Sequence, residues 1–322
     1  MFLTGTFLLI LPLLQGCSLL FVAKGGTRYV ESHKEKAPQA ASLAREMKKN
    51  PSHLKVQKQA KKEEPKRLKN GKPVKAASPA ENIKITKVSR PTTNTAFAPG
   101  ERLKFEVRAL SILGGYATLE VGDYTTVEGR PCTPLTARAN TVFPMSAIYP
   151  VKDVQTSFFD TVDFLSWKFQ NNVLEGNYKS HNLEKYDQVK HKVVRQHNDE
   201  AALTLDVAPF SQDIISCFYY FRLLPMEEGK TYSIPTQSGG KNYELIVRVD
   251  KRETITVPAG TFECFRVKPL IKSETVFRNN EQIDLWVTAD ARHLPVKIKS
   301  GILIGSIDVD LLEASLPQMA MK

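Results

Sequence analysis

From about Thr92 onward, apolar and polar residues alternate in short runs that are separated by turn residues. A period of two is typical of strands with one buried face. The pattern predicts strands at residues 102–110, 116–122, 243–249, 253–257, 264–271, 283–288, 295–300 and 304–312. The sequence Pro258-Ala259-Gly260-Thr261 has the turn chemistry of a hairpin between two of these strands. We therefore expect an antiparallel sheet.

One stretch has helical spacing instead, and it predicts a helix over residues 212–224. Its apolar stripe consists of Ile214, Ile215, Phe218, Phe221 and Leu224. Ser211 is the expected cap, Asp213 suits the first turn, and Pro225 ends the helix. Such a stripe is more often core than ligand site. The expected fold is mainly β, with one short helix packed on a long curved antiparallel sheet or an open barrel-like fold.

A basic segment precedes this domain. Residues 24–78 contain 16 Lys or Arg against 5 Asp or Glu, which accounts for the whole net charge of +11. The segment is rich in Lys, Ala, Ser, Pro and Gln and lacks strand periodicity, so we expect a largely disordered tether. It either serves as a solvated spacer or holds anionic lipid headgroups. Nucleic acid is not an expected partner.

The chain begins with an apolar run over residues 2–14, which is the length of a signal-peptide core. Leu14-Gln15-Gly16-Cys17 follows and resembles the bacterial lipoprotein signal. That resemblance implies cleavage before Cys17 and acylation of this residue, and Ser18 implies delivery to the outer membrane, facing the periplasm. Two alternatives stay open, because no Lys or Arg precedes the run and apolar residues continue to Ala23: an uncleaved inner-membrane anchor or a plain cleaved signal.

These features divide the chain into four predicted parts. A signal peptide covers residues 1–16, and a lipidated N-terminus with the basic tether covers residues 17–91. The antiparallel β domain covers residues 92–315, and a short tail covers residues 316–322. A hydrophobic content of 42% is sufficient for a sizeable core in such a domain.

Five segments of the β domain resemble a known family. In order they are PGERLKFEVRALSILGGYATLEV, YPVKDVQTSFFD, DIISCFYYFRLLPMEEGKTYSIP, RETITVPAGTFECFRVKP and LWVTADARHLPVKIKS. They are similar to the landmarks of the bacterial exported domain-of-unknown-function family numbered 3108, over residues 99–313. The resemblance implies a secreted or envelope β protein, often a lipoprotein, with no activity to transfer. The last segment also resembles the strand-turn-strand of periplasmic lipoprotein carriers, whose half-barrel cradles acyl chains.

Catalytic motifs are absent from the sequence. It contains no GxSxG elbow and no HExxH pair, and Gly229-Lys230-Thr231 lacks the first glycine of a phosphate loop. The aspartates at 153, 160 and 163 are close in sequence, but turn and loop positions explain them, and nothing pairs two carboxylates. The sequence predicts no catalytic residue and no cofactor.

Metal-ligand spacing is also missing. His191 and His197 share a strand face with Val193 and Arg195, and no carboxylate lies at that spacing. Cys132, Cys217 and Cys264 are either small buried residues or the source of one disulfide with a spare thiol, and their spacing does not fix a pair.

Aromatic residues give the better indication of a ligand site. The candidate ligand-binding residues are Tyr149, Tyr219, Tyr220, Arg222 and Trp286, on the hypothesis that they line a concave sheet face. The competing interpretation places the aromatic residues in the core and pairs Arg222 with an acid inside the domain.

The leading hypothesis is a non-catalytic envelope lipoprotein that is anchored to the membrane through Cys17. Its β domain would bind an amphiphile, such as a lipid or glycolipid, or an envelope protein partner. Two alternatives remain: a glycan-acting hydrolase that uses a carboxylate pair, and a structural cell-envelope protein whose basic spacer reaches the cell wall or a protein complex.

Overall fold

The computed structural model describes residues 84–272, 277–278, 283–301 and 306–317. The predicted signal peptide, Cys17 and the tether up to residue 83 lie outside the described residues. Within the described ranges, no helix is long and apolar enough to cross a membrane. The first hydrogen bonds that tie the chain to the β domain come from Thr86, whose backbone N–H donates to the Thr231 carbonyl at 2.7 Å.

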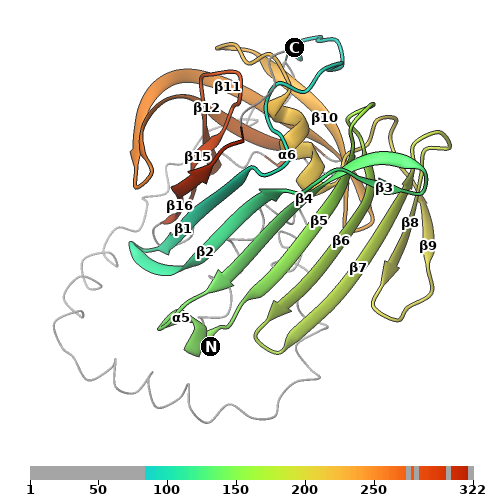
Figure 1. Cartoon of the computed structure of the whole chain (residues 1–322), viewed down its shortest axis with the longest axis horizontal. Helices are drawn as coiled ribbons and strands as arrows, with labels where there is room; N and C mark the ends of the chain where they lie inside the picture. The colour runs from blue at the N-terminus through green and yellow to red at the C-terminus, as the bar shows by residue number, and fades with distance from the viewer. Residues whose placement is uncertain (1–83, 273–276, 279–282, 302–305, 318–322) are drawn as a thin grey trace, which may run out of the picture. The chain divides into compact units, whose positions relative to one another are not determined.

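The described residues form strands and two helices (Figure 1). The first group of strands is β1 (Arg102–Ala109), β2 (Ile112–Val121), β3 (Thr125–Val127), β4 (Arg130–Thr141), β5 (Lys152–Asp160), β6 (Ser166–Glu175), β7 (Tyr178–Asp187), β8 (Lys192–His197) and β9 (Leu203–Asp206). The second group is β10 (Thr231–Ser238), β11 (Lys241–Val257), β12 (Gly260–Lys272), β13 (Phe277–Arg278), β14 (Ile283–Thr288), β15 (Pro295–Gly301) and β16 (Ser306–Ser315). The helices are α5 (Met145–Ile148) and α6 (Ile214–Arg222).

All strands belong to one 16-stranded sheet, whose order is β10-β11-β12-β14-β15-β16-β1-β2-β4-β5-β6-β7-β8-β9. β3 pairs with β4, and β13 pairs with β12. Every strand pairing is antiparallel, and β10 and β9 remain as the two ends of the order, so the sheet is not closed into a barrel. The predicted fold class is therefore confirmed, with the four-residue helix α5 as an addition.

Each expected strand overlaps a strand of the structure. Residues 243–249 and 253–257 are parts of one strand, β11, which continues through a register shift between Val249 and Arg252. The predicted hairpin joins β11 to β12. No strand was predicted for residues 123–190, where the structure has β3 to β7.

Helix α6 begins two residues later than expected and has a different cap. Asp213 is the N-cap: its Oδ1 accepts from the backbone N–H groups of Ile215 and Ser216 at 2.8 Å each. Ser216 completes a capping box, because its Oγ accepts from the Asp213 backbone N–H at 2.8 Å. Ser211 is wrong as the cap, since its hydroxyl is buried and makes no hydrogen bond among the described residues.

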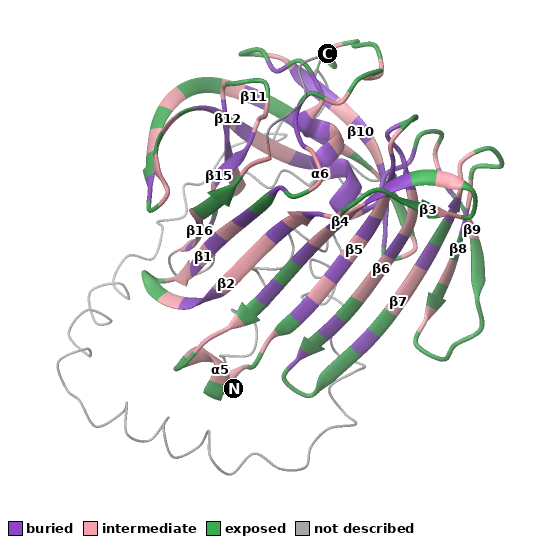
Figure 2. Ribbon diagram, in the orientation of Figure 1, coloured by how far each residue is buried: buried purple, intermediate pink, exposed green. Residues whose placement is uncertain are grey.

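Helix α6 packs on one face of the sheet, which we call the inner face. It contacts β4, β5 and β10, and its buried side chains include Ile215 and Tyr219. Inward residues of β1 and β4, such as Leu103 and Leu135, belong to the same apolar cluster. Burial alternates along β5 to β7, whereas α6 is buried over most of its length (Figure 2). The helix therefore completes the core that the sheet alone leaves open.

The segment between β9 and α6 covers one edge of the sheet. The Gln212 backbone N–H donates to the Pro235 carbonyl at 2.9 Å, and the Gln212 carbonyl accepts from the Gln237 N–H at 2.8 Å. The two Gln212 bonds protect β10 from pairing with another chain. Asn242 of β11 also reaches β9, because its side chain donates to the Asp206 carbonyl at 2.9 Å.

Candidate functional site

Four polar side chains lie next to each other across β5, β6, β7 and β8. Direct register pairs join each one to the next. Since side chains alternate along a strand, the member on β5 shares the face of Ser157, two residues further on, whose hydroxyl donates to Asp213 of α6 at 2.5 Å. The four therefore lie on the inner face. We call them the polar row: Gln155, Asn171, Asn182 and His197.

The row contains hydrogen-bonding atoms that the described residues do not satisfy. Both amide atoms of Gln155 and the Oδ1 of Asn171 are buried and have no hydrogen-bond partner. Asn182 is better satisfied, because its Oδ1 lies 2.6 Å from His197 Nδ1 and accepts from Arg195 at 3.3 Å. Gln155 is 2% exposed, whereas Asn182 and His197 are half-buried, so the row opens toward β8.

Asp213, the N-cap of α6, lies at the end of the row that is nearest the helix. Its Oδ2 accepts from the hydroxyls of Ser157 and Ser166, while its Oδ1 accepts the two backbone N–H groups of the cap. Complete burial raises the pKa of this carboxyl group, and the four hydrogen bonds oppose that shift. All of its accepting positions are directed at the protein, so Asp213 has a structural role.

A second acidic group, Glu184, lies on β7 two residues beyond Asn182. Its carboxylate faces Arg195 of β8 at 3.4 Å and accepts from the Tyr186 hydroxyl at 3.1 Å. Burial raises the pKa of Glu184 to about 7, and the Arg195 charge partly offsets this effect. The pair gives this part of the inner face a charge that changes near neutral pH.

A carboxyl pair, which the sequence pattern does not predict, lies at the other end of the row. Asp153 of β5 and Glu175 of β6 are 2% and 8% exposed and interact with each other. Burial is the main cause that raises the pKa of Asp153 to about 7, and the Glu175 charge adds to it. The pKa of Glu175 is also raised by burial. The Tyr149 hydroxyl donates to Glu175 at 3.3 Å, and burial raises the pKa of Tyr149 to about 12.

The arrangement is suited to hydrogen bonding. Amide side chains both donate and accept, so the row can match the hydroxyl groups of a ligand. The two carboxyl groups of a glycosidase stand about 5 to 9.5 Å apart and flank the bond that is cut, whereas Asp153 and Glu175 interact directly with each other. Within the described ranges, no group of three or more His, Cys, Asp or Glu is placed to hold a metal ion.

The comparison with protein families gives one match. The family model described as "Protein of unknown function (DUF3108)" covers residues 104–312, which is more than half of the chain. The chain belongs to this family. The family resemblance seen in the sequence is confirmed, and the five segments that carried it lie at residues 99–300. A comparison with curated proteins gives no match.

Three solved structures are similar to this DUF3108 chain. A β-barrel-like protein of the unknown-function family DUF1849 from Brucella abortus matches with a TM-score of 0.49 and 12% identity, over 69% of this chain and 99% of that one. A candidate exported protein with a YmcC-like fold from Bacteroides fragilis has a TM-score of 0.30 and 13% identity, over 70% and 100%. A candidate lipoprotein from Parabacteroides distasonis has a TM-score of 0.28 and 12% identity, over 71% and 100%.

In this DUF3108 chain, Arg222 forms the internal ion pair that the sequence left as an alternative. Its guanidinium donates to both carboxylate oxygens of Glu101 at 2.7 and 2.9 Å and to the Ala96 carbonyl at 3.0 Å. Arg222 is 0% exposed and Glu101 is 2% exposed. Its guanidinium also lies 5.1 Å from the Tyr219 ring centroid. Arg222 and Tyr219, two of the three candidate ligand residues on α6, therefore contribute to the core.

The other three predicted ligand residues do not gather at one place. Trp286 lies on β14, where it is buried and donates to Glu253. Tyr220 is half-buried and its pKa is raised by burial, with Arg90 acting in the opposite direction. Tyr149 is near the polar row, through Glu175. A ligand-binding role stays a prediction for these three residues.

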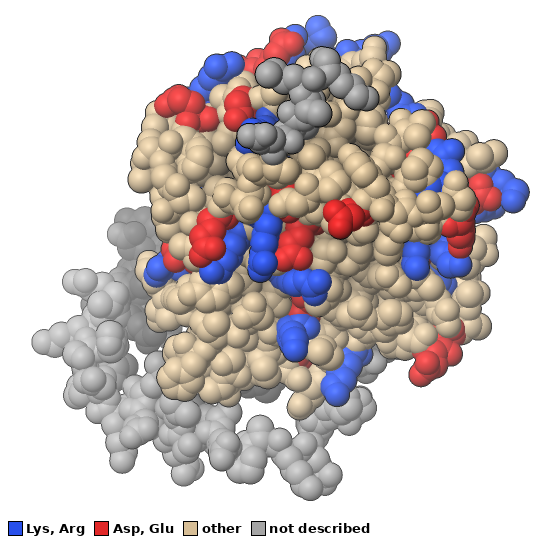
Figure 3. Space-filling view, viewed as in Figure 1, with Lys and Arg blue, Asp and Glu red and all other residues tan. Residues whose placement is uncertain are grey.

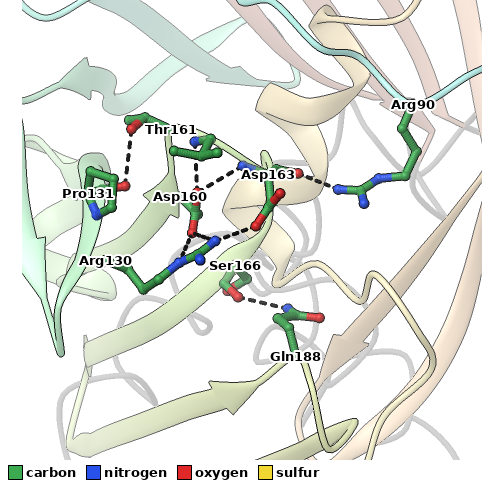
Figure 4. Close-up of polar contacts among 9 residues, drawn as sticks. Arg90, Arg130, Pro131, Asp160, Thr161, Asp163, Ser166 and Gln188 are labelled. Atoms are coloured by element: carbon green, nitrogen blue, oxygen red, sulfur yellow. Dashed lines mark hydrogen bonds and ion pairs between the residues drawn. The ribbon is translucent and has the colours of Figure 1, made fainter.

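Asp160 and Asp163 have the turn roles that the sequence indicated. Oδ1 of Asp160 accepts from the backbone N–H groups of Val162 and Asp163 at 2.8 and 2.9 Å. Arg130 bridges the two carboxylates from the start of β4 (Figure 4). The same figure shows Arg90 donating to the Asp163 carbonyl. This network closes the β5–β6 turn, at the end of β5 away from the carboxyl pair.

The cysteines match the interpretation as small buried residues. Cys132 and Cys264 are buried thiols, and Cys217 is buried in α6, where its Sγ donates to the Ile214 carbonyl at 3.2 Å. Burial raises the pKa of Cys132 to about 11 and that of Cys264 to about 12. A high pKa keeps these groups as weakly reactive thiols near neutral pH.

Proposed function

We propose that this DUF3108 chain is a non-catalytic envelope lipoprotein whose β domain binds an amphiphile with a hydroxyl-rich headgroup, such as a glycolipid, at the polar row. Acylation of Cys17 would anchor it to the outer membrane, and the basic tether would serve as a spacer or contact anionic lipid. The binding part of the proposal rests on the described residues of the inner face.

The observation that carries the proposal is the amide group of Gln155. Its donor and its acceptor are both buried without a partner, in a fold that satisfies neighbouring groups such as Asp213 with four hydrogen bonds. A buried polar group without a partner costs about 1–3 kcal/mol. A ligand that offers both a hydroxyl donor and an acceptor would recover this free energy, and Asn171 would add a further contact.

The charged groups around the row support binding more than catalysis. Asp213 is fully hydrogen-bonded, Glu184 is paired with Arg195, and Asp153 and Glu175 interact with each other. A general acid or base must reach the proton that it transfers. Apart from Oδ2 of Asp153, which is buried and makes no hydrogen bond among the described residues, these carboxyl oxygens face protein partners, so we assign the row to recognition.

Mass spectrometry of the full-length chain, extracted from its membrane in mild detergent, tests the anchor and the ligand together. The expected intact mass is that of a chain that begins at an acylated Cys17, with a retained hydroxyl-rich lipid at close to one per chain. The double variant Gln155→Leu/Asn171→Leu should retain at least about 10-fold less of this lipid, because the loss of two hydrogen bonds costs at least about 1.4 kcal/mol.

Gln170→Leu is the matched control, because it changes an amide of β6 on the opposite face from Asn171. It should retain the lipid as the unchanged chain does. The row variant should unfold at the same temperature or higher, since it removes unsatisfied buried groups. Equal lipid retention in the row variant and the control would contradict binding at the row, and an unacylated Cys17 would contradict the anchor.

A further inference from the structure

Exposed apolar side chains gather at one end of the sheet, away from the α6 side of the polar row. Three connections meet there: the β1–β2 turn, the β4–β5 segment that contains α5, and the β6–β7 turn. The pairings that bring them together include Gly115 with Thr141 and Val151 with Glu175. We call this set of residues the apolar rim: Leu110, Ile112, Phe143, Ile148, Leu174 and Tyr178.

The rim residues are unusually exposed for side chains of this kind. Phe143 is 82% exposed and Ile148 is 68% exposed, and the other four are between 42% and 57% exposed. Single exposed apolar residues are ordinary on protein surfaces, but six of them on three neighbouring connections at one end of a sheet are a candidate interaction site, although alternation places Leu174 and Tyr178 on opposite faces. Figure 3 shows a largely uncharged surface where Figure 1 places α5.

The exposed charge next to the rim is mainly positive. In residues 110–115, 142–152 and 174–179, the charged residues are Lys152, Lys179 and Glu175. Arg108, which donates to the Ser111 carbonyl in the β1–β2 turn, is paired with Glu106. Both lysines are exposed, whereas Glu175 is 8% exposed and interacts with Asp153. The opposite end of the domain differs, because exposed Val162 and Val189 lie within two residues of Asp163 and Lys190, which have opposite charges.

Hydrogen bonds between neighbouring segments fix the position of the rim. Tyr149, directly after α5, donates to Glu175, and its backbone carbonyl accepts from the Thr141 hydroxyl at 3.2 Å. The Gly176 N–H donates to the Pro150 carbonyl at 2.8 Å. Gly176 has a φ of +57°, and a Cβ there would lie 3.3 Å from the Tyr149 ring, so glycine suits the position. The apolar side chains are therefore exposed on a supported surface.

We propose that the apolar rim docks the β domain onto an anionic lipid bilayer, with the apolar side chains in the interfacial layer and the two lysines at the headgroups. Amphipathic surfaces with aromatic and aliphatic side chains beside basic ones bind in this way. Phe143 and Tyr178 are the aromatic members, and Lys152 and Lys179 supply the attraction to anionic lipid. This surface is separate from the polar row, so the proposal goes beyond ligand binding there.

Site-directed spin labelling of the full-length chain in liposomes tests the proposal. Ile148→Cys places a nitroxide on the rim, and Val189→Cys places a matched one at the opposite end, where the native valine is 85% exposed. The liposomes contain phosphatidylcholine with about one third phosphatidylglycerol, a strongly anionic surface. Collisions with apolar oxygen and with a water-soluble nickel chelate report whether each label lies in lipid or in water. The unchanged chain, taken through the same labelling, measures any background from native thiols.

The expected result is an oxygen-to-nickel collision ratio at least about 10-fold higher at position 148 than at position 189, as interfacial burial of an apolar side chain requires. In liposomes of phosphatidylcholine alone, the ratio at position 148 should fall. Equal ratios at the two positions would overturn the proposal. Spin–spin broadening at position 148 would also overturn it, because a second copy of the chain would then cover the rim. An unchanged ratio without phosphatidylglycerol would refute the role of the lysines.

Discussion

The Arg222–Glu101 pair offers the sharpest test of how this fold is stabilised. Glu101→Gln keeps the shape of the side chain and removes its charge, so the guanidinium stays buried at 0% exposure with only neutral acceptors around it. Two charge-assisted hydrogen bonds, at 2.7 and 2.9 Å, lose their ionic partner. Removal of one member of a buried pair costs about 3–5 kcal/mol. We expect the free energy of unfolding to fall by that amount.

Urea unfolding at pH 7, followed by tryptophan fluorescence, measures the change. The matched control is Glu313→Gln, which removes the partner of Lys104 in a pair of similar length, 2.8 Å, whose members are 34% and 65% exposed. Exposed pairs contribute at most about 1 kcal/mol, so the control should stay within that limit. A cost for Glu101→Gln no larger than that of the control would refute the reasoning.

A double variant separates the buried charge from lost packing. Glu101→Leu/Arg222→Met removes both charges and keeps most of the side-chain volume. Since apolar residues replace a buried pair at little cost, this variant should be more stable than either single variant. If it is as unstable as Arg222→Met alone, the loss comes from the packing of Arg222 against Phe97 and Tyr219 and not from an unpaired charge.

Two further predictions concern buried carboxyl groups. The Asp153 pKa of about 7 lies above the ordinary value, so the folded state keeps a proton that the unfolded state loses, and the free energy of unfolding falls as the pH rises from about 4 to 7. Between pH 5 and pH 8 that fall is up to about 3 kcal/mol, and Asp153→Asn should remove it in urea unfolding at the two pH values. An unchanged difference between pH 5 and pH 8 would argue against the raised pKa. Asp213→Ala should lower the free energy of unfolding by at least about 2 kcal/mol, because it removes the cap and leaves two serine hydroxyls without their acceptor. Ser211→Ala should leave the free energy of unfolding nearly unchanged, and equal losses in the two variants would restore Ser211 as the cap.

The strands that the sequence predicts correctly are those with clear apolar positions. β1 has one apolar face and alternates, whereas β14 has a continuous apolar run that is buried on both faces, and the boundaries of both strands differ from the predicted ones by at most one residue. The strands β6 and β7 read SWKFQNNVLE and YKSHNLEKYD, with polar residues on both faces, so a hydrophobic period of two is hard to detect. Their inward positions include Asn171 and Asn182 of the polar row. The polar residues on the inner face make these strands difficult to predict, and the same residues form the candidate site, as expected where function departs from the core pattern.

The candidate residues divide on similar grounds. The sequence identified Arg222 as a residue with an internal acid or a ligand as partner, but it could not name Glu101, because 121 residues separate them. The pairing of Asp153 with Glu175 depends on the register of β5 and β6, which single-sequence patterns do not fix when both faces are polar. Aromatic residues alone do not separate a ligand site from the core, since side chains such as Tyr219, which is fully buried, also fill cores well.

The two proposals together restrict how a ligand would be presented. Gln155 is four residues from Val151, at the rim end of β5, which corresponds to about 13 Å at a rise of 3.3 Å per residue. With the rim at the bilayer, the polar row would lie within about that distance of the headgroups. An amphiphile could then place its headgroup on the row while its acyl chains stay in the membrane. That geometry requires polar groups on the inner face between the α6 core and the rim, and the amide side chains of the polar row supply them. A ligand that binds only after complete extraction from lipid would contradict this arrangement.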